Sequence, residues 1–376
     1  AYEMPTVTGV QTCALPIWGA DKIICLIISA LALLSVLMIG STSVDTGFLS
    51  RSVIIQIAAY IIGAVCVVVI LHYNYNIAQN IGRSLYAVAI ILLLLVYIPG
   101  LGIEANGSLA WINLKIITLQ PSEIVKILFI LIMAGYLNDK KDELYNFKAL
   151  IKAGLIAAPI ILIVLKEDLG SALVFASIWV VMIFFAGIDI KAFIKFFVIV
   201  AAMVPFAYIF MADYQKQRIE SFLHPGNLSL PGNYQVWQSK VAIGSGGFFG
   251  KGLFNGTQKS LDFIPVQTSD FIFSVIGEEL GFIGGLVVIV LFTVLFIRMM
   301  KILHEALDFY GALIISGIIG MFVFQVFENI AMTIGLMPVT GITLPFLSYG
   351  GSSIVSNMLA IGLVLNVGVR SKRINF

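Results

Sequence analysis

The feature that most constrains this chain is the recurrence of apolar runs, each about as long as a membrane-crossing helix. Such runs lie near residues 23–40, 52–71, 84–99, 122–137, 149–165, 169–187, 192–211, 270–297, 311–334 and 352–369. A bilayer core about 30 Å thick needs roughly 17–25 apolar helical residues. Hydrophobic residues make up 60% of the chain and charged residues 11%, which excludes the soluble globular class. We predict an all-α polytopic membrane protein with about ten transmembrane helices.

The stretch 149–187 is too long to be a single span. As one helix rising about 1.5 Å per residue it would be about 60 Å long. The charged run Lys166-Glu-Asp168 lies at its midpoint, which predicts a hairpin there. An even number of spans then places both termini on the same side of the membrane.

The distribution of basic residues predicts the orientation. With the N-terminus inside, most of them fall on inner segments: Lys22, Arg83, Lys140, Lys141, Lys148, Lys152, Lys191, Lys195, Arg298, Lys301, Arg370, Lys372 and Arg373. Short inner loops of membrane proteins are enriched in lysine and arginine, so we expect both termini in the cytoplasm. Residues 212–269 then form a large outer segment between helices seven and eight. The basic residues are scattered, so no nucleic-acid partner is expected.

Residues 1–18 differ from the rest of the chain. Part of this stretch, residues 7–17, resembles the in-frame translation of a common sequencing adaptor, so we expect a scar that replaces the native start. The alternative is a genuine disordered tail. Residues 19–376 are predicted to form one domain. The cysteines Cys13, Cys25 and Cys66 show no paired spacing, so neither a disulfide framework nor a metal site is expected.

Asp270 is the residue whose position most favours a functional role. It ends a polar, glycine-rich block and begins the span 270–297, where a carboxylate at the membrane boundary is costly to keep. On one continuous helix, a stripe of small residues would share its face: Ser274, Gly277, Gly281 and Gly284. Small residues allow close approach of a helix or lipid tail, so the stripe predicts a groove with Asp270 at its mouth. Alternatively, Asp270 or Ser269 only caps the helix.

Two further charged features have both a structural and a functional interpretation. Glu123 and Lys126 are three residues apart on one helical face. They either neutralise each other or leave Lys126 facing an anionic ligand. Asp168 precedes Leu-Gly-Ser171 and could either serve the site or cap the sixth helix.

Other polar segments lie near the ends of the predicted spans. Gln325, Glu328 and Asn329 share one helical face, and the loop 335–353 is rich in glycine and hydroxyl groups. Irregular backbone of this kind is tolerated at membrane depth only beside protein or a watery cavity. The glycine-rich segment 232–257 could offer backbone donors and lysines to an anion such as diphosphate. An apolar run around Trp111 is too short to cross, and we expect it at the membrane interface.

Five blocks, in this order, carry a resemblance to a known family. They include Gln120-Pro-Ser-Glu-Ile-Val-Lys126, Asp168-Leu-Gly, Ala242-Ile-Gly-Ser-Gly-Gly, Thr268-Ser-Asp-Phe-Ile-Phe and Pro338-Val-Thr-Gly-Ile-Thr-Leu-Pro-Phe. Together they resemble the SEDS family, the membrane glycosyltransferases of bacterial cell-wall growth, over nearly the whole chain after residue 19. Within the family, residues 251–258 look more like the elongation branch, RodA, than the division branch, FtsW.

The resemblance implies polymerisation of lipid II into glycan strands on the outer face of the bacterial cytoplasmic membrane during elongation. Asp270 matches the essential aspartate of the family and would be the general base on the acceptor 4-hydroxyl. A cation would stabilise the leaving undecaprenyl diphosphate: Lys240, Lys251, Lys126 or a divalent Mg²⁺ or Mn²⁺ ion. The resemblance also implies substrate-binding roles for Trp111, Glu123, Asp168, Gln325, Ser348, Ser352 and Ser353.

The partners implied by the resemblance are lipid II, a class B penicillin-binding protein, other membrane proteins of the elongation complex and the bilayer. Two rival functions remain open, a lipid II flippase and a non-catalytic scaffold that activates a partner. A transport residue is expected near the midplane, so an outward Asp270 favours catalysis.

The chain departs from the pattern of the family at three positions. Val266 stands where members usually carry glutamate, Lys166-Glu replaces Gln-Pro before Asp168, and Ala110 stands where many carry arginine. These departures leave Asp270 and Asp168 in place.

Overall fold

Every predicted span contains a helix in the computed structural model. The structure describes residues 19–42, 49–105, 108–113, 118–144, 147–211, 213–257 and 266–371, so the expected scar at 1–18 lies outside it. The helices over the ten ranges are α1 (Lys22–Thr42), α2 (Arg51–His72), α4 (Gly82–Leu94), α5 (Pro121–Asp139), α6 (Phe147–Glu167), α7 (Leu169–Phe185), α8 (Ile190–Phe210), α12 (Ile272–Glu305), α13 (Phe309–Thr333) and α14 (Gly351–Ser371).

Length and composition confirm the membrane character of most of these helices. Seven helices in the described part of the chain are long and apolar enough to cross a membrane: α1, α2, α5, α6, α12, α13 and α14. Two shorter apolar stretches are Gly82–Tyr97, which is α4 with the 3₁₀ turn η3 (Leu95–Tyr97), and α7. Many of their large apolar side chains face outward, as a lipid-facing surface requires; Leu26 and Ile61, for example, are 71% and 60% exposed.

The hairpin predicted at Lys166-Glu-Asp168 is confirmed. α6 ends at Glu167 and α7 begins at Leu169. The Asp168 carboxylate accepts hydrogen bonds from the backbone N–H of Gly170 (3.2 Å) and Ser171 (2.8 Å). Asp168 therefore caps α7, which stops one long helix from forming here.

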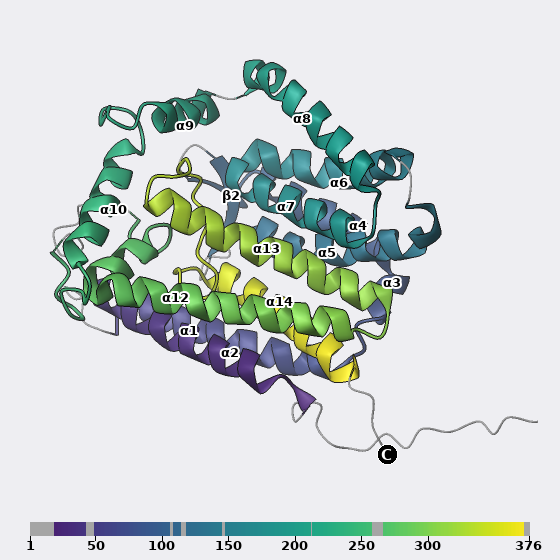
Figure 1. Ribbon diagram of the computed structural model, residues 1–376, viewed down its shortest axis with the longest axis horizontal. Coiled ribbons are helices and arrows are strands. Elements are labelled where there is room, and N and C mark those ends of the chain that lie inside the picture. Colours follow the sequence, from purple (N-terminus) through teal and green to yellow (C-terminus); the bar gives the residue numbers. More distant parts are fainter. Residues whose placement is uncertain are drawn as a thin grey trace, which may run out of the picture.

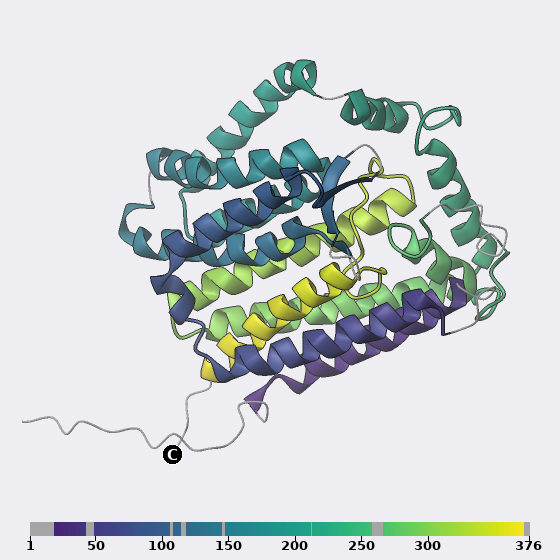
Figure 2. The same ribbon diagram turned by 180° about the vertical axis from the view of Figure 1, so that it is seen from behind.

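α13 lies at the centre of the bundle (Figure 1). It packs against α5, α7 and α12, and its Ile314, Ile318 and Phe322 are fully buried. Small residues allow the close approach, because a methyl group added at Gly317 would lie 2.9 Å from side-chain atoms of Ile130 and Met182. On another side of the molecule α14 packs along α2, and α2 against α1 (Figure 2).

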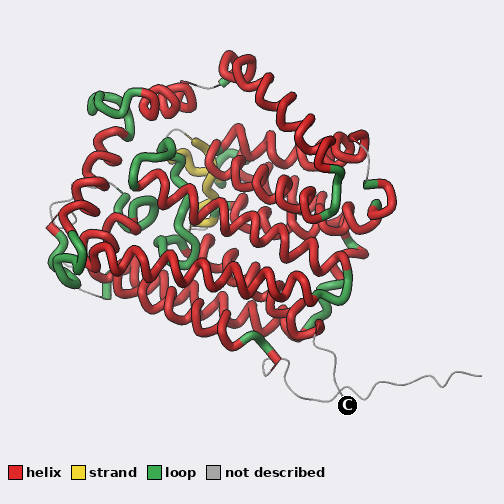
Figure 3. Tube along the Cα trace, in the orientation of Figure 1, coloured by secondary structure: helices red, strands yellow, loops and turns green. Residues whose placement is uncertain are grey.

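A small sheet interrupts the otherwise helical chain (Figure 3). Strands β1 (Gly102–Ala105), β2 (Ser108–Asn113) and β3 (Thr118–Leu119) pair antiparallel in that order. Trp111 lies in β2 opposite Ile103. The all-α prediction did not include these strands, because a run this short forms a sheet only when its neighbours pair with it. β2 packs against α5, and β3 against α14.

The described residues of the predicted outer segment, 213–257 and 266–269, include the helices α9 (Asp213–Leu223) and α10 (Asn233–Gly246). The chain leaves α8, runs through α9 and returns along α10, which packs against α12 (Figure 1). Two further short elements lie among the described residues, α3 (Ile77–Asn80) and the turn η4 (Lys141–Glu143).

α12 is broken where the sequence suggested a continuous helix. Gly281 has φ 65° and ψ −161°, a conformation that essentially only glycine adopts. Backbone hydrogen bonds with the segment 247–252 replace those lost at the break: Lys251 N to Glu278 O (3.0 Å), Gly252 N to Glu279 O (3.0 Å), Phe282 N to Gly247 O (2.9 Å) and Ile283 N to Phe248 O (3.3 Å). The glycine-rich segment thus completes a broken helix, and these donors are not available to an anion.

The prediction of a groove beside Asp270 is also wrong, because α10 packs against that face of α12. A Cβ atom at Gly246 of α10 would lie 2.0 Å from the carbonyl oxygen of Gly277. The hydroxyls of Ser239 and Ser274 lie 2.5 Å apart across the same contact. The small-residue stripe therefore serves helix packing within the chain.

Candidate active site

Asp270 lies in the turn that precedes α12. Hydrogen bonds to the backbone carbonyl oxygens of this turn hold it in place. Tyr349 N donates to Thr268 O (2.8 Å), and the Ser348 hydroxyl donates to Ser269 O. The Asn329 amide of α13 donates to Asp270 O and to Ile342 O, both at 2.8 Å. Three anchors thus hold the turn against the loop 335–350.

The side chain of Asp270 does not cap α12. The cap position is Phe271, and no side chain bonds the first turn there. The Asp270 carboxylate instead accepts a hydrogen bond from the Ser269 hydroxyl (3.0 Å) and remains partly exposed. The capping alternatives for Asp270 and Ser269 are therefore wrong, and the carboxylate remains available for chemistry.

The loop 335–350 is itself fastened to the bundle. The hydroxyl of Ser35 in α1 donates to Leu347 O (2.9 Å), and the amide of Gln56 in α2 donates to Ser348 O (3.1 Å). The Ser348 hydroxyl also accepts from Leu344 N (2.8 Å). The structure thus gives Ser348 a role in shaping the loop that carries the site.

Thr340 and Gly341 connect Asp270 to two helices, because α7 and α9 contact Thr340 and Gly341 lies next to Asp270. A Cβ atom at Gly341, whose φ is +77°, would lie 3.6 Å from Asp270 Oδ2, and one at Gly170 of α7 would lie 2.7 Å from Thr340 O. The Arg218 guanidinium of α9 donates to the same Thr340 oxygen (3.0 Å). Residues far apart in sequence thus converge beside Asp270.

Three carboxyls share this region with one arginine. Asp168 and Arg218 lie close enough to Asp270 to shift the pKa of its carboxyl. Glu328 interacts electrostatically with all three groups. The Asp168 carboxylate has three donors, the third being the Ser171 hydroxyl at 2.7 Å. Glu328 is fully buried. Asp168 thus both caps α7 and lies beside Asp270.

The protonation of Asp270 reflects opposing influences. Burial raises the pKa of its carboxyl most strongly, the Ser269 hydrogen bond lowers it, Asp168 raises it and Arg218 lowers it. The net result is a pKa raised above the ordinary value of an aspartate. A carboxylate with a raised pKa is a stronger base, as proton abstraction requires.

The sequence matches one family over nearly all of its length. The model of the FtsW, RodA and SpoVE family, described as "Cell cycle protein", matches residues 21–373. The chain belongs to this family. It is the SEDS family that the five sequence blocks resembled, so that prediction is confirmed. With its apolar helices, the chain is an integral membrane protein.

Relatives from several branches of the SEDS family are similarly close. Stage V sporulation protein E of Bacillus subtilis is 38% identical over 83% of this chain and 85% of its own. Peptidoglycan glycosyltransferase MrdB of Escherichia coli K12 is 35% identical, covering 94% and 95%. Probable peptidoglycan glycosyltransferase FtsW of Trichlorobacter lovleyi is also 35% identical, covering 94% of each chain. Identity alone therefore does not separate the branches.

Solved structures confirm the SEDS fold. A chain described under "Structural coordination of polymerization and crosslinking by a peptidoglycan synthase complex" gives a TM-score of 0.82 at 27% identity, covering 94% of this chain and 99% of that one. The rod shape determining protein RodA of Thermus thermophilus gives 0.70 at 26% identity, covering 94% and 98%.

The three candidate lysines of this SEDS protein have different surroundings. Lys126 is 2% exposed and pairs with Glu123 at 2.8 Å. Lys251 pairs with buried Glu278 at 2.7 Å. Lys240 lies in none of the ion pairs found among the described residues. The neutralising interpretation of Glu123 and Lys126 is therefore correct for the structure as it stands.

The other predicted substrate-binding residues lie in different elements and differ in exposure. Gln325 is buried in α13, and its Oε1 has no hydrogen-bond partner in the described residues. Ser353 contacts the Thr343 hydroxyl (3.1 Å), and Ser352 is partly exposed at the start of α14. Trp111 is half-buried in β2. No hydrogen bond joins these residues to Asp270, so their substrate-binding roles stay predictions.

Arg218 is the residue that sequence reasoning missed. It lies in the polar helix α9, where neighbouring residues include Lys216 and Glu220. No spacing in that stretch distinguishes it from an ordinary solvated charge. Only the fold brings it to Thr340.

A divalent cation was one sequence-based alternative for charge stabilisation. In the described ranges, no three histidine, cysteine, aspartate or glutamate side chains group in a way that could hold a metal ion. No described residue is therefore assigned to a metal.

Proposed function

We propose that this protein is a peptidoglycan glycosyltransferase that polymerises lipid II, with Asp270 as its general base. The observation that carries the proposal is the placement of the Asp270 carboxylate. It is partly exposed, accepts a hydrogen bond from the Ser269 hydroxyl and is held by a backbone fixed at three points. Relatives named as peptidoglycan glycosyltransferases support the reaction class.

In the proposed reaction, the 4-hydroxyl of the acceptor sugar attacks the anomeric carbon of the lipid-linked donor. A new C–O bond forms, and the bond from that carbon to the diphosphate breaks with its electron pair going to undecaprenyl diphosphate. The Asp270 carboxylate takes the proton of the attacking hydroxyl. Asn329 holds the backbone carbonyl of Asp270. The base therefore does not have to be ordered when the acceptor binds.

We place this chemistry on the outer face of the bacterial cytoplasmic membrane. The support is the excess of lysine and arginine on the opposite segments, which puts both termini in the cytoplasm. Residues 212–269, with α9 and α10, then lie outside. Arg218 brings α9 beside Asp270, where a lipid-linked sugar delivered to the outer leaflet would arrive.

We also propose a class B penicillin-binding protein as the partner, with other elongation proteins. A structural relative comes from a peptidoglycan synthase complex described as coordinating polymerization and crosslinking, which supports a transpeptidase partner. The assignment to elongation rests on residues 251–258. The division-type paralogue is the alternative, because FtsW and MrdB relatives are equally identical.

A lipid II flippase is the rival function. An activity assay in detergent solution distinguishes a flippase from a polymerase. Purified protein with its penicillin-binding partner is incubated with labelled lipid II in micelles, where no two membrane faces exist. We expect glycan ladders from the wild type and from Asp213→Ala, an exposed acid on α9, and none from Asp270→Ala. Ladders that persist in a folded Asp270→Ala variant would refute the base, and their absence from every sample would favour transport.

A further inference from the structure

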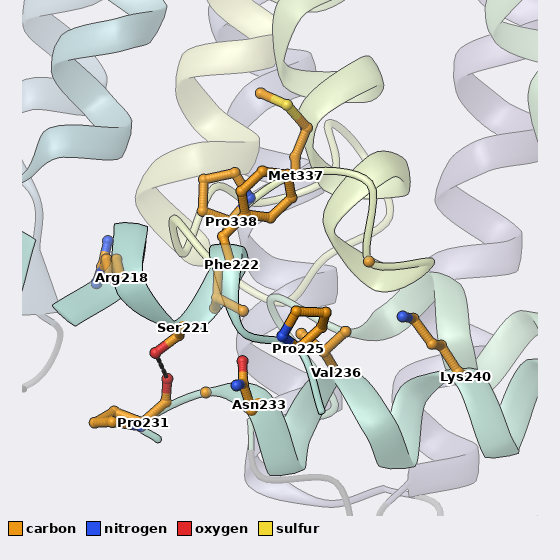
Figure 4. Close-up of a pocket in the computed structure, with 13 residues that line it drawn as sticks. Arg218, Ser221, Phe222, Pro225, Pro231, Asn233, Val236, Lys240, Met337 and Pro338 are labelled. Carbon is orange, nitrogen blue, oxygen red and sulfur yellow. Dashed lines mark hydrogen bonds between the residues drawn. The ribbon is translucent and has the colours of Figure 1, made fainter. Parts of the chain in front are cut away.

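The loop 335–350 is held differently at its beginning and at its end. Near its beginning, Met337 and Pro338 line a pocket between the loop, α9 and α10 (Figure 4). Side chains that border a cavity lack packing partners on that side. The last part of the loop, residues 344–350, instead lies against α1 and α2 and bonds the turn before Asp270. The support that this loop gives to Asp270 therefore depends on α1 and α2.

Gln56, in the second turn of α2, bridges the loop and α1. It is fully buried. Its Nε2 donates to Ser35 Oγ of α1 (2.9 Å) and to Ser348 O (3.1 Å), and its Oε1 accepts from Gly350 N (3.3 Å). An amide within an apolar span is costly unless it is hydrogen-bonded. Here its bonds go to the loop backbone and to a serine that also bonds the loop.

Two neighbouring side chains complete this contact, so we name Ser35, Gln56 and Tyr60 together the loop clamp. The Ser35 hydroxyl donates to Leu347 O (2.9 Å). The Tyr60 hydroxyl, one turn after Gln56 in α2, donates to Phe346 O. Phe346 has a φ of 62°, and a residue other than glycine keeps this conformation only where its surroundings enforce it. The loop clamp thus holds a strained stretch of backbone.

Ser348 connects the loop clamp to the turn that carries Asp270. Its carbonyl oxygen accepts from Gln56, while its hydroxyl donates to the carbonyl oxygen of Ser269. That carbonyl belongs to the peptide group that joins Ser269 to Asp270. The backbone N–H of the next loop residue, Tyr349, holds the same turn. A displacement of the loop end therefore moves the backbone directly before Asp270.

We propose that Gln56 is a positioning residue for the base, and that with Ser35 and Tyr60 it sets where the Asp270 carboxylate lies. The inference rests on the proposed function and adds two helices that act on the site through the loop. A misplacement of about 1 Å can lower a rate by roughly 10²-fold. Gln56 thus affects the chemical step through the backbone of the loop.

Steady-state kinetics of lipid II polymerisation, with the penicillin-binding partner present, test this role. Gln56→Leu removes the amide while keeping a side chain of similar size. We expect kcat to fall by roughly 10- to 100-fold and KM to stay within about twofold, because the lost interaction serves the transition state. Ser35→Ala and Tyr60→Phe each remove one donor to the loop and should cause smaller losses of kcat. Thermal melting verifies that each variant is folded.

Two matched controls separate positioning from stability. Ser177→Ala removes a hydroxyl-to-carbonyl bond between α7 and α13 (2.9 Å), and Tyr86→Phe removes one between α4 and α6 (3.2 Å). Both lose the same kind of contact between helices as the single-donor variants of the loop clamp, so their unfolding temperatures should fall by similar amounts. Their kcat should stay at the wild-type value. An equal loss of kcat in these controls, or wild-type kcat in a folded Gln56→Leu variant, would overturn the proposal.

Hydrogen exchange tests the loop clamp independently of activity. In Gln56→Leu the amides of residues 344–350 and 266–271 should exchange faster than in the wild type, whereas Ser177→Ala should leave them unchanged. Unchanged exchange at 266–271 in Gln56→Leu would overturn the proposal, whether or not the protein polymerises lipid II. Full polymerisation by Asp270→Asn would instead refute the proposed base and leave the exchange result standing.

Discussion

At the residue scale, burial and one hydroxyl act on the basicity of Asp270 in opposite directions. Burial raises the pKa of the carboxyl, while the hydrogen bond from Ser269 stabilises the charged form and lowers it. A general base works only when deprotonated. The reaction rate should therefore rise with pH as Asp270 loses its proton.

This balance predicts the pH dependence of polymerisation. Because the pKa of Asp270 is raised, the rising limb of initial rate against pH should lie above the ordinary aspartate value of about 3.9. Ser269→Ala removes a lowering influence and should move that limb to still higher pH. Ser245→Ala, which removes an exposed hydroxyl from α10, should leave it unchanged. A limb that does not move in Ser269→Ala would contradict this assignment.

A second residue-scale prediction concerns Lys251 and Glu278. Glu278 is fully buried and accepts from Lys251 Nζ at 2.7 Å. Lys251→Met should lower the free energy of unfolding by about 3 kcal/mol, because one partner of a buried ion pair is lost. Adding Glu278→Gln should restore part of that loss, and Lys301→Met, in an exposed pair, should change little. Thermal unfolding in detergent compares these three variants with the wild type, and equal stability of Lys251→Met and Lys301→Met would contradict the structural role.

Residue types and positions allowed part of the site to be predicted. Asp270 and Asp168 were identified because a charge at the end of an apolar run is conspicuous. Arg218 was not, because a charge in a polar helix is ordinary until the fold brings it to Thr340. Lys251 is one of the candidate cations for diphosphate, but sequence spacing cannot reveal that Glu278 lies beside it.

At the element scale, the break in α12 links the glycine-rich segment to the site. Gly281 has a positive φ, and a Cβ atom there would lie 2.3 Å from Gly250 N. Gly281→Ala should therefore abolish folding or lower the unfolding temperature strongly, since backbone on both sides cannot yield. Gly244→Ala in α10 meets nothing within 4 Å and should be tolerated. The fraction of monodisperse protein after solubilisation checks both, and a well-behaved Gly281→Ala variant would contradict the kink.

Helix existence was predictable, whereas the break and the sheet were not. The ten apolar runs gave helices because span length and hydropathy are local properties of the chain. The break at Gly281 depends on hydrogen bonds from residues 247–252, and β1 to β3 depend on pairing with one another. Neither is encoded in the periodicity of a single segment.

At the scale of the whole molecule, the proposed orientation can be tested by labelling. Leu228 lies exposed between α9 and α10, and Asp142 lies exposed in η4. In a chain whose native cysteines are replaced, a membrane-impermeant thiol reagent applied to intact cells should label Leu228→Cys. It should label Asp142→Cys only after permeabilisation. The reverse pattern would place Asp270 on the cytoplasmic side and contradict chemistry on the outer face.

The whole-molecule account depends on a carboxylate that the packing of α12, α13 and the loop 335–350 holds in place for proton transfer. The most direct test is the initial rate of lipid II polymerisation by Asp270→Asn, a nearly isosteric change, with the penicillin-binding partner present. Loss of a general base lowers a rate by roughly 10²–10⁴-fold. We predict a loss in that range with unchanged thermal stability. A folded Asp270→Asn variant that polymerises within about threefold of the wild type would contradict the central claim.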